Sequence, residues 1–377
     1  MTAKVLHIQE KKRTPANTVA KLEDFDYQEG ETIDSTIIIN NPQVTIYCLD
    51  PENQRAIFVE TPAGLDLSQP PFFYHAQYNN AQRLIAVPLT ELAELTKEIT
   101  PIEELVFIYS MGRSGSTLLS KIFNQLDSVL SLSEPDVFSQ LVGMRNPDGS
   151  NDEQVAGLIK ICATLLSQQT NSKKYSHCVI KLRSFGINLG DLMNHVFPEA
   201  KVIFLYRNAE DVVKSSMRSF VFMSSMLPQI QKNIELYTRF IHLLKKYAND
   251  IDWTDANATD LYITSWLSVM ERYLLLYQQG IPSFAIRYED LITKKQEVVT
   301  TIFEKCNLPI IEVEKACEVF SKDAQIGSNL SQETTRKNEQ EQEEVFELHQ
   351  KIKHFFNQHP ELKNPNFIAP GTICYNQ

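Results

Sequence analysis

Leu105–Leu119, with the sequence LVFIYSMGRSGSTLL, decides the fold of this 377-residue chain. Its opening LVFIY is a continuous apolar run, typical of a strand inside a parallel sheet with both faces covered. A short loop with Gly112 and Gly115 follows, and from Thr117 onward the sequence TLLSKIFNQL carries apolar residues at helical spacing. The stretch therefore predicts a buried strand, a tight loop and a helix in direct succession.

The predicted loop is suited to holding an anion. Its glycines let the backbone curl so that N–H groups face a ligand, and the helix N-terminus adds unpaired donors and a partial positive charge. The hydroxyls of Ser114, Ser116 and Thr117 are further donors, and Arg113 offers a planar cationic fork that matches phosphate oxygens. The alternative is an ordinary Gly/Ser turn before a capped helix. The position between strand and helix favours the anion site.

The cation of this loop is not placed as in ATPases and nucleotide kinases. Their motif, G-x-x-x-x-G-K-[ST], uses the Lys to reach the β- and γ-phosphates and the Ser/Thr to hold magnesium. Here the cation is Arg113, before the second glycine, and no Gly-Lys-Ser/Thr follows. An ATP- and magnesium-dependent kinase is weakened by this difference and stays open as an alternative.

The remaining chain after residue 104 alternates between predicted strands and helices. Strands are predicted at Cys178–Leu182, Lys201–Tyr206 and Ser283–Tyr288, and helices at Thr117–Leu126, Ser225–Ala248, Asp260–Gln279 and Asn338–Gln350. Strands that alternate with helices pack as βαβ units on a parallel sheet. The predicted fold class is α/β, with a central parallel sheet of the P-loop type flanked by helices.

Residues 1–98 have a different pattern. Short β-rich runs at Thr36–Asn40, Val44–Leu49 and Ala56–Glu60 are separated by turn sequences, and Leu84–Thr100 predicts a strand followed by a short helix. No catalytic signature occurs in this part. We predict a β-rich N-terminal extension, a lid or an oligomerisation element, ahead of a main domain at 99–377. A second active domain is the less favoured alternative.

The composition limits the partners and the compartment. With 47 acidic and 36 basic side chains the net charge is −11, which argues against nucleic acids and anionic membranes, so a polyanion needs a local basic pocket. The six cysteines are scattered without a C-x-x-C pair, which predicts reduced thiols and no metal site. No secretion signal and no apolar window of about 18 residues occurs, which predicts a soluble, cytoplasmic protein.

Met111–Thr117, MGRSGST, resembles a loop of the sulfotransferase family, in the Arg-bearing form of carbohydrate and tyrosyl-protein sulfotransferases. Members transfer a sulfuryl group from 3′-phosphoadenosine 5′-phosphosulfate (PAPS) and release 3′-phosphoadenosine 5′-phosphate (PAP). The resemblance implies that Arg113 through Thr117 bind the 5′ end of PAPS, with no metal involved.

A second pair resembles the family's 3′-phosphate site, a strand ending in Arg with a Ser eight residues later. Arg207 ends the predicted strand at Lys201–Tyr206, Asn208 can cap the next helix, and Ser215 has the required spacing. Arginine at the carboxyl edge of a parallel sheet is well placed for a ligand. A surface Arg and a helical Ser are each common; their combination favours the cofactor site.

Two further stretches resemble the family, which extends the resemblance over residues 104 to 340. Ile286–Leu291, IRYEDL, is similar to its late strand and implies that Tyr288 contacts the adenine, with a buried core aromatic as the alternative. Gly327–Arg336 is similar to the C-terminal loop over the cofactor and implies a phosphate contact for Arg336.

Sulfuryl transfer needs a cation at the leaving phosphate and a base at the acceptor. Arg113 is the predicted cation. Lys181-Leu182-Arg183 replaces the Lys-x-His of cytosolic members, and an arginine cannot be the base near neutral pH. Lys181 is predicted to contact the sulfuryl group, with a structural role as the alternative.

The predicted base is Glu134. Ser133-Glu134-Pro135-Asp136 resembles the Glu element of carbohydrate and tyrosyl-protein sulfotransferases, and Glu134 follows Arg113 by 21 residues. A partly desolvated carboxylate can accept a hydroxyl proton. The alternative is that Glu134 caps a helix near Pro135. His177 and His195 are weaker candidates, and Asp136 is a candidate partner of the base.

The sequence therefore predicts a PAPS-dependent sulfotransferase that acts on a hydroxyl or amine of a small molecule, for example a natural product. The acidic balance favours a cationic acceptor, with contacts from Phe220–Tyr237 and the N-terminal extension. The alternatives are the kinase and a non-catalytic PAP-binding scaffold. A homo-oligomer stays open.

Overall fold

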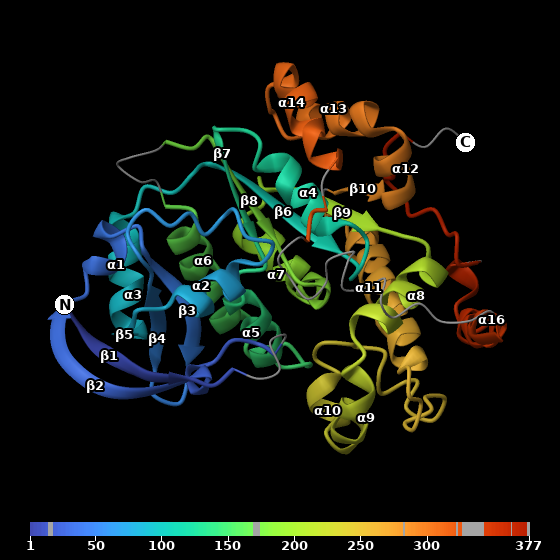
Figure 1. Ribbon diagram of the computed structural model, residues 1–377, viewed down its shortest axis with the longest axis horizontal. Helices are drawn as coiled ribbons and strands as arrows, with labels where there is room; N and C mark the ends of the chain where they lie inside the picture. Colours follow the sequence, from blue (N-terminus) through green and yellow to red (C-terminus); the bar gives the residue numbers. More distant parts are fainter. Residues whose placement is uncertain are drawn as a thin grey trace. The chain divides into compact units, whose positions relative to one another are not determined.

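The computed structural model describes residues 1–13, 18–168, 174–281, 283–321, 323–325, 343–362 and 364–374 (Figure 1). The chain divides into two compact units. The first consists of Met1–Val106, Leu126–Leu182 and Leu192–Ala200, and the second of Phe107–Gln125, Arg183–Asp191 and Lys201–Gln377. The division at residues 98 and 99 stays a prediction.

An antiparallel sheet of five strands lies in the N-terminal part, in the order β2-β1-β5-β4-β3 (blue in Figure 1). Its strands are β1 (Thr2–Lys11), β2 (Phe25–Asp34), β3 (Val44–Asp50), β4 (Arg55–Glu60) and β5 (Arg83–Pro88). A hydrophobic core packs against this sheet. It includes Leu6, Tyr47, Ile57 and Leu84, whose side chains are fully buried, and this burial stabilises the sheet. The β-rich extension is therefore confirmed, although β1 and β2 were not predicted.

Thr36–Asn40 is not a strand, which corrects the prediction. Ile37–Asn40 forms the short helix α1. The Asp34 carboxylate accepts a bond from the Thr36 N–H at 2.9 Å, which turns the chain after β2, and the Asn40 N–H then donates to the Thr36 carbonyl at 3.0 Å. The turn chemistry outweighs the β propensity of three isoleucines, because propensity is a weak constraint in a short segment. Helices α2 (Phe73–Asn80) and α3 (Leu89–Leu95) complete this part.

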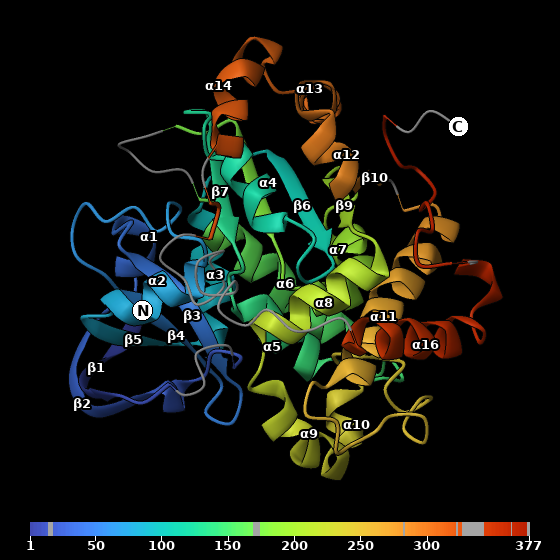
Figure 2. The same cartoon turned by 45° about the vertical axis from the view of Figure 1, so that its right-hand side comes forward.

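The second sheet has five parallel strands in the order β10-β9-β6-β8-β7 (Figure 2). They are β6 (Glu104–Ser110), β7 (Val129–Ser133), β8 (His177–Lys181), β9 (Lys201–Tyr206) and β10 (Phe284–Arg287). All but β7 were predicted. β6 is apolar and buried on both faces, as a central parallel strand requires. The predicted α/β class with a parallel central sheet is confirmed.

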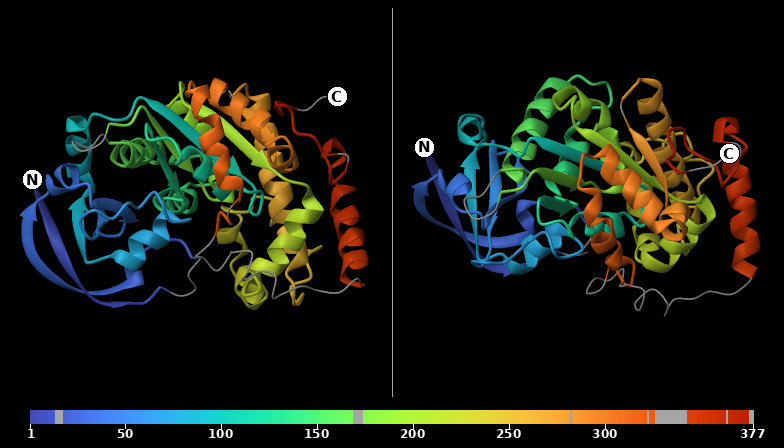
Figure 3. Two further views of the ribbon diagram at one scale, coloured as in Figure 1. Left: turned by 45° about the horizontal axis from the view of Figure 1, so that its top comes forward. Right: turned by 90° about the horizontal axis from the view of Figure 1, so that it is seen from above.

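Helices follow the strands of this sheet (Figure 3). The helices are α4 (Ser116–Phe123), α5 (Val137–Met144), α6 (Asp152–Leu166), α7 (Gly190–Val196), α8 (Ala209–Ser219), α11 (Thr259–Gln278), α12 (Tyr288–Thr293), α13 (Lys295–Lys305), α14 (Val313–Cys317) and α16 (Glu343–Phe356). The predicted helix at Asp260–Gln279 is confirmed by α11. Of the helix predicted at Asn338–Gln350, residues 338–342 lie outside the described part. Among the described residues, no helix combines the length and the apolar character that crossing a bilayer requires.

The single long helix predicted at Ser225–Ala248 is wrong. The chain forms α9 (Met223–Lys232), then α10 (Ile234–Tyr237), and then continues in turns. Asn233 separates the two helices, with a non-helical backbone and its side chain bonded to the Gln229 carbonyl at 3.0 Å. An asparagine side chain that bonds a nearby backbone carbonyl competes with helix propagation.

Candidate active site

The loop between β6 and α4 is tied to strand β9. The Met111 N–H donates to the Leu205 carbonyl at 3.1 Å, and the Ser114 hydroxyl donates to the Met111 carbonyl at 2.7 Å. Ser114 is fully buried, so its hydroxyl holds the loop in shape. Its neighbours Ser116 and Thr117, by contrast, line a cavity at the start of α4.

Two residues of the loop have left-handed backbones. Gly115 has φ +87° as the N-cap of α4, and Arg113 has φ +62°. A side chain at Gly115 is also excluded by space, because its Cβ would lie 2.6 Å from ring atoms of Tyr288. Left-handed backbone at a non-glycine residue costs energy and is found where the surroundings enforce it, often at functional sites. The loop is therefore a built feature that presents Arg113.

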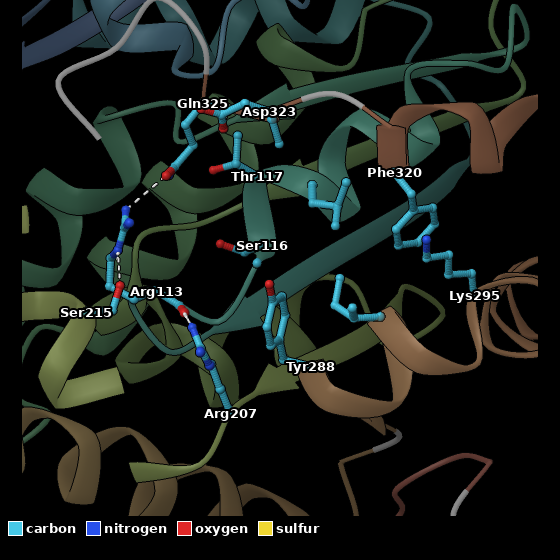
Figure 4. Close-up of a pocket in the computed structure, with 14 residues that line it drawn as sticks. Arg113, Ser116, Thr117, Arg207, Ser215, Tyr288, Lys295, Phe320, Asp323 and Gln325 are labelled. Carbon is cyan, nitrogen blue, oxygen red and sulfur yellow. Dashed lines mark hydrogen bonds between the residues drawn. The ribbon is translucent and has the colours of Figure 1, made fainter. Parts of the chain in front are cut away.

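A cavity of about 340 Å³ lies at this loop (Figure 4). Its volume falls in the range of small-molecule sites, about 300–1,000 Å³. It is lined by Arg113, Gly115, Ser116, Thr117, Leu118, Arg207, Ser215, Tyr288, Ile292, Lys295, Phe320, Asp323, Ala324 and Gln325. The loop residues and the predicted Arg207–Ser215 pair therefore face the same space, although about 90 residues of chain separate them.

Arg113 is the centre of the cavity's charge. Its Nε donates to the Ser215 Oγ at 3.0 Å and its Nη1 to the Gln325 Oε1 at 2.9 Å, which fixes the guanidinium (Figure 4). Burial, and then the charges of Arg207 and Arg218, lower the pKa of Arg113 to about 10. Asp323 opposes this effect only in part. An excess of buried positive charge favours binding of an anion.

Arg207 contacts the backbone of the loop. Its Nη1 donates to the Arg113 carbonyl at 3.4 Å, and its guanidinium covers the Tyr288 ring at 4.7 Å from the centroid. The Arg207 Nε is buried and has no hydrogen-bond partner among the described residues. The side chain is thus held in place, and its Nε–H group can donate to a ligand.

The backbone around Arg207 is fixed by its neighbours. The Trp266 indole donates to the Arg207 carbonyl at 3.0 Å. The Asn208 side chain accepts bonds from the Glu210 and Asp211 N–H groups at 2.9 and 3.3 Å, which confirms the predicted cap of α8. Capping starts α8 at the residue that brings Ser215, two turns later, to the cavity.

Several cavity residues were not predicted. Lys295, Phe320, Asp323 and Gln325 come from α13 and the segments after it, and the Lys295 Nζ lies 5.2 Å from the centroid of the Phe320 ring. No motif in the sequence pointed to them, because their positions depend on how the C-terminal part folds back. The predicted phosphate contact Arg336, with the rest of Gly327–Arg336, lies outside the described residues.

The predicted catalytic residues Glu134 and Lys181 form a pair in the first unit. The Lys181 Nζ donates to the Glu134 Oε1, and the Glu134 N–H donates to the Lys181 carbonyl at 2.7 Å. The Glu134 side chain is 15% exposed and the Lys181 side chain 3%, so the ion pair is largely shielded from water. Glu134 follows β7 directly and Lys181 ends β8, as Arg113 and Arg207 follow β6 and β9. All four come from the carboxyl ends of parallel strands, where α/β proteins place ligand-binding residues.

The Glu134 backbone is left-handed, with φ +59°. The N-cap position of α5 belongs to Asp136, two residues later. Of the weaker candidates for the base, His177 is buried in β8 with its Nδ1 2.8 Å from the Ser176 hydroxyl, and His195 is exposed on α7. The residues that line the described cavity include neither histidine, and they do not include Glu134 or Lys181 either.

A family model described as "Sulfotransferase family" matches residues 105–312, more than half of the chain. The chain belongs to the sulfotransferase family. The matched range starts at the strand before the Arg113 loop and includes Glu134, Lys181, Arg207, Ser215 and Tyr288. The family resemblance predicted from the sequence is confirmed.

This sulfotransferase matches solved structures at low identity. The sulfotransferase domain from the curacin biosynthetic pathway is 16% identical, over 69% of this chain and 99% of that one, with a TM-score of 0.40. Mouse sulfotransferase SULT7A1, solved with PAP, is 11% identical over 73% and 90%, with a TM-score of 0.37. Retinol dehydratase, solved with androsterone and PAP, is 13% identical over 83% and 96%, with a TM-score of 0.35. No curated protein matches the chain.

Proposed function

We propose that this sulfotransferase moves the sulfuryl group of PAPS to a hydroxyl or amine of a small-molecule acceptor and releases PAP. The observation that carries the proposal is the cationic cavity, in which Arg113 and Arg207 follow two different strands and serve one space. The pKa of Arg113 is lowered first by burial and then by the charges of Arg207 and Arg218, which Asp323 opposes only in part. A ligand with two anionic ends would balance it.

The residues present fit such a ligand. In the proposal, Arg113, Ser116 and Thr117 hold the 5′ end, with N–H groups at the start of α4 as further donors. The buried Nε of Arg207, which has no hydrogen-bond partner among the described residues, and the hydroxyl of Ser215 serve the 3′-phosphate. Tyr288 offers a ring at the cavity wall for the adenine. When bound, PAPS supplies an activated sulfuryl group whose leaving group is a phosphate.

Glu134 and Lys181 are the proposed proton acceptor and the proposed sulfuryl contact. In this role the Glu134 carboxylate, which accepts the hydrogen bond from the Lys181 ammonium, takes the proton of the acceptor's hydroxyl or amine. When the Glu134 carboxylate takes the acceptor's proton, its attraction for Lys181 falls. The Lys181 ammonium is then free to donate to oxygen atoms that gain charge during transfer. The pair would therefore couple proton removal to charge stabilisation.

The competing kinase would need a metal and a Walker-type lysine, and the loop has Arg113 instead. Thermal denaturation with PAP, ATP, and ATP plus magnesium distinguishes the two functions. We expect PAP alone to raise the melting temperature, because a ligand at 100 times its Kd stabilises the native state by about 2.7 kcal/mol. Stabilisation by ATP only in the presence of magnesium would contradict the proposal.

The scaffold alternative is tested by turnover. Labelled PAPS is incubated with pools of phenols, alcohols, amines and guanidines, and label in any acceptor excludes a non-catalytic protein. We expect Glu134→Gln to lose turnover and to keep PAP affinity within about twofold. Near-normal turnover of this variant would remove Glu134 from the mechanism.

The acceptor, the compartment and the assembly remain parts of the proposal. The net charge of −11 supports a cationic acceptor, and Phe220–Tyr237 and the N-terminal extension are the proposed contacts. A natural product, a cytoplasmic location and a homo-oligomer are compatible with it. In the acceptor pools, preference for guanidines over neutral phenols would support the charge argument.

A further inference from the structure

A buried ion network in the first unit centres on Arg13. Its Nη2 donates to the Asp136 Oδ2 at 3.0 Å, and its Nη1 donates to the Tyr47 hydroxyl at 2.8 Å. The Tyr47 hydroxyl in turn donates to the Asp24 Oδ2 at 2.6 Å. The guanidinium also covers the Tyr74 ring, 4.7 Å from its centroid. The side chains of Arg13, Asp24 and Asp136 are 1%, 2% and 0% exposed, so the network is inside the protein.

Such a network needs a reason beyond stability. Burial of charged groups costs desolvation energy that their attraction only partly returns, and apolar replacements are often as stable. Here the cost is visible at Asp24, whose pKa is raised by burial despite its bonds to Tyr47 and Arg13. What the network supplies is a fixed geometry for Asp136, which also accepts the Ala20 N–H at 2.6 Å.

A second contact holds the same helix. Helix α5 starts after Asp136, and one turn further on the Gln140 amide pairs with β3. Its Nε2 donates to the Leu49 carbonyl and its Oε1 accepts the Leu49 N–H, both at 2.6 Å. The N-terminal part therefore holds the start of α5 at two positions: Arg13 and Ala20, which lie between β1 and β2, bond Asp136, and Leu49 of β3 bonds Gln140.

Glu134 lies between fixed points. On one side its N–H is bonded to the Lys181 carbonyl of β8. On the other side Pro135, with its restricted φ, leads directly to Asp136. The left-handed backbone of Glu134 is a conformation that a non-glycine residue keeps only when its surroundings impose it. Phe72 of the N-terminal part also lies against this pair, with its ring centroid 5.7 Å from the Lys181 Nζ.

We propose that Arg13, acting through Asp136, positions the carboxylate of Glu134. The N-terminal part of the chain would then contribute to catalysis. Arg13 and Asp136 are positioning residues and need not touch the substrate. The inference rests on the proposed role of Glu134 as the base. It assigns residues 1–98 a role in catalysis that their sequence did not indicate.

The test compares kinetics of Asp136→Asn and Arg13→Lys with the control Arg145→Gln. Asp136→Asn keeps shape and an acceptor for the Ala20 N–H but loses the charge, and Arg13→Lys keeps the charge but loses the fork. Arg145 pairs with Asp152 at 2.8 Å at the other end of α5, so its variant removes an ion pair of the same helix away from Glu134. With labelled PAPS and the acceptor found in the pools, we expect kcat to fall about 10²-fold for Asp136→Asn. Arg13→Lys is expected to lose less, and Arg145→Gln to stay within about threefold.

Two readouts separate positioning from mere support. First, the PAP affinity is expected to stay within about twofold in both variants. Second, Asp136→Asn should add less than about twofold to the loss caused by Glu134→Gln, because residues that act through one another are not additive. A purely structural residue would lower the activity of both backgrounds equally. That outcome, or normal kcat in Asp136→Asn, overturns the inference.

A measurement that needs no turnover completes the test. Amide hydrogen exchange of the peptide spanning residues 131–138 is expected to accelerate at least tenfold in Asp136→Asn and to be unchanged in Arg145→Gln. Unchanged exchange in Asp136→Asn overturns the inference whether or not the protein is active. If Glu134→Gln is fully active while exchange changes as expected, Glu134 is not the base. The result would then show only that Asp136 holds the backbone around Glu134. If Glu134→Gln is inactive while Asp136→Asn is normal, only the positioning role fails.

Discussion

Arg13 and Arg113 are two shielded arginines with opposite surroundings. Arg13 contacts two buried carboxylates, Asp24 and Asp136, at 3.6 and 3.0 Å. Arg113 is bonded to neutral groups, Ser215 and Gln325, and its pKa is lowered by burial and by two neighbouring arginines. The first arginine forms ion pairs with carboxylates inside the protein, whereas the second, among the described residues, forms no ion pair and has only Asp323 as a nearby opposing charge.

The difference separates a structural cation from a binding cation. Removing one partner of a balanced network lowers the stability of the protein, because the remaining charges are left buried without a counter-ion. An unbalanced cation costs stability in the free protein, and an anionic ligand recovers that cost. Replacing Arg13 by a neutral residue should therefore lower the stability of the fold. Replacing Arg113 by a neutral residue should leave the stability unchanged and weaken ligand binding.

The largest expected effect is on stability, from Arg13→Met. Two carboxylates would remain in an apolar interior, which should lower the free energy of unfolding by about 3–5 kcal/mol. Urea denaturation monitored by circular dichroism measures it. The triple variant Arg13→Met, Asp24→Asn and Asp136→Asn removes all three charges and should recover most of the loss. A single variant as stable as the wild type would contradict the comparison.

The next effect is on catalysis, from Arg113→Gln. We expect kcat/KM to fall about 10²–10³-fold, the usual cost of one donor to a developing charge. In contrast to Arg13→Met, the melting temperature of the ligand-free protein should not fall, since the substitution removes like-charge repulsion. A drop of several degrees without ligand would mean that Arg113 is structural.

Gly115→Ala tests the shape of the cationic loop. The added Cβ meets the Tyr288 ring at 2.6 Å in a left-handed backbone, which should cost about 1–3 kcal/mol and lower PAP affinity tenfold or more in isothermal titration calorimetry. Gly112→Ala is the matched control, because, apart from its chain neighbours, no heavy atom of the part of the chain that the structure describes lies within 4 Å of the added Cβ. An equal loss in both variants would show that the Tyr288 contact is unimportant.

A smaller effect is expected from Ser215→Ala. The loss of one hydrogen bond to Arg113 should weaken PAP binding by about 0.5–1.5 kcal/mol, a change of two- to twelvefold. Ser216→Ala on the same helix removes a hydroxyl that bonds the Val212 carbonyl at 2.8 Å, and should leave PAP binding unchanged. The same titration measures both, and a larger loss in Ser216→Ala would place the binding face elsewhere on α8.

The smallest effect concerns the pH dependence of the balanced network. Burial raises the pKa of Asp24 above its ordinary value of 3.8, so the folded protein holds this proton more tightly than the unfolded chain. The stabilising contribution is complete below pH 3.8 and is lost as the pH rises through the folded-state pKa. Relative to Asp24→Asn, the wild type should therefore gain stability as the pH falls from 7 to 4. Parallel melting curves of the two proteins would contradict the raised pKa.

Local pattern was enough to predict much of the fold. The apolar run before Arg113, the loop glycines and the Asn208 cap are read from neighbouring residues, because strands, turns and helix starts depend on short-range chemistry. The same reasoning failed at Thr36–Asn40 and Ser225–Ala248, where turn and side-chain bonds changed the outcome. β1, β2 and β7 were missed altogether.

The sequence by itself determined which side chains follow the strands of the parallel sheet, and with them the family and the residues proposed for PAPS. Only the tertiary structure decided that Arg113 bonds Ser215, 102 residues away, and that Arg13 bonds Asp136, 123 residues away. Such pairs leave no trace in a local pattern. Their formation depends on the packing of distant segments, and charge balance is a property of that packing.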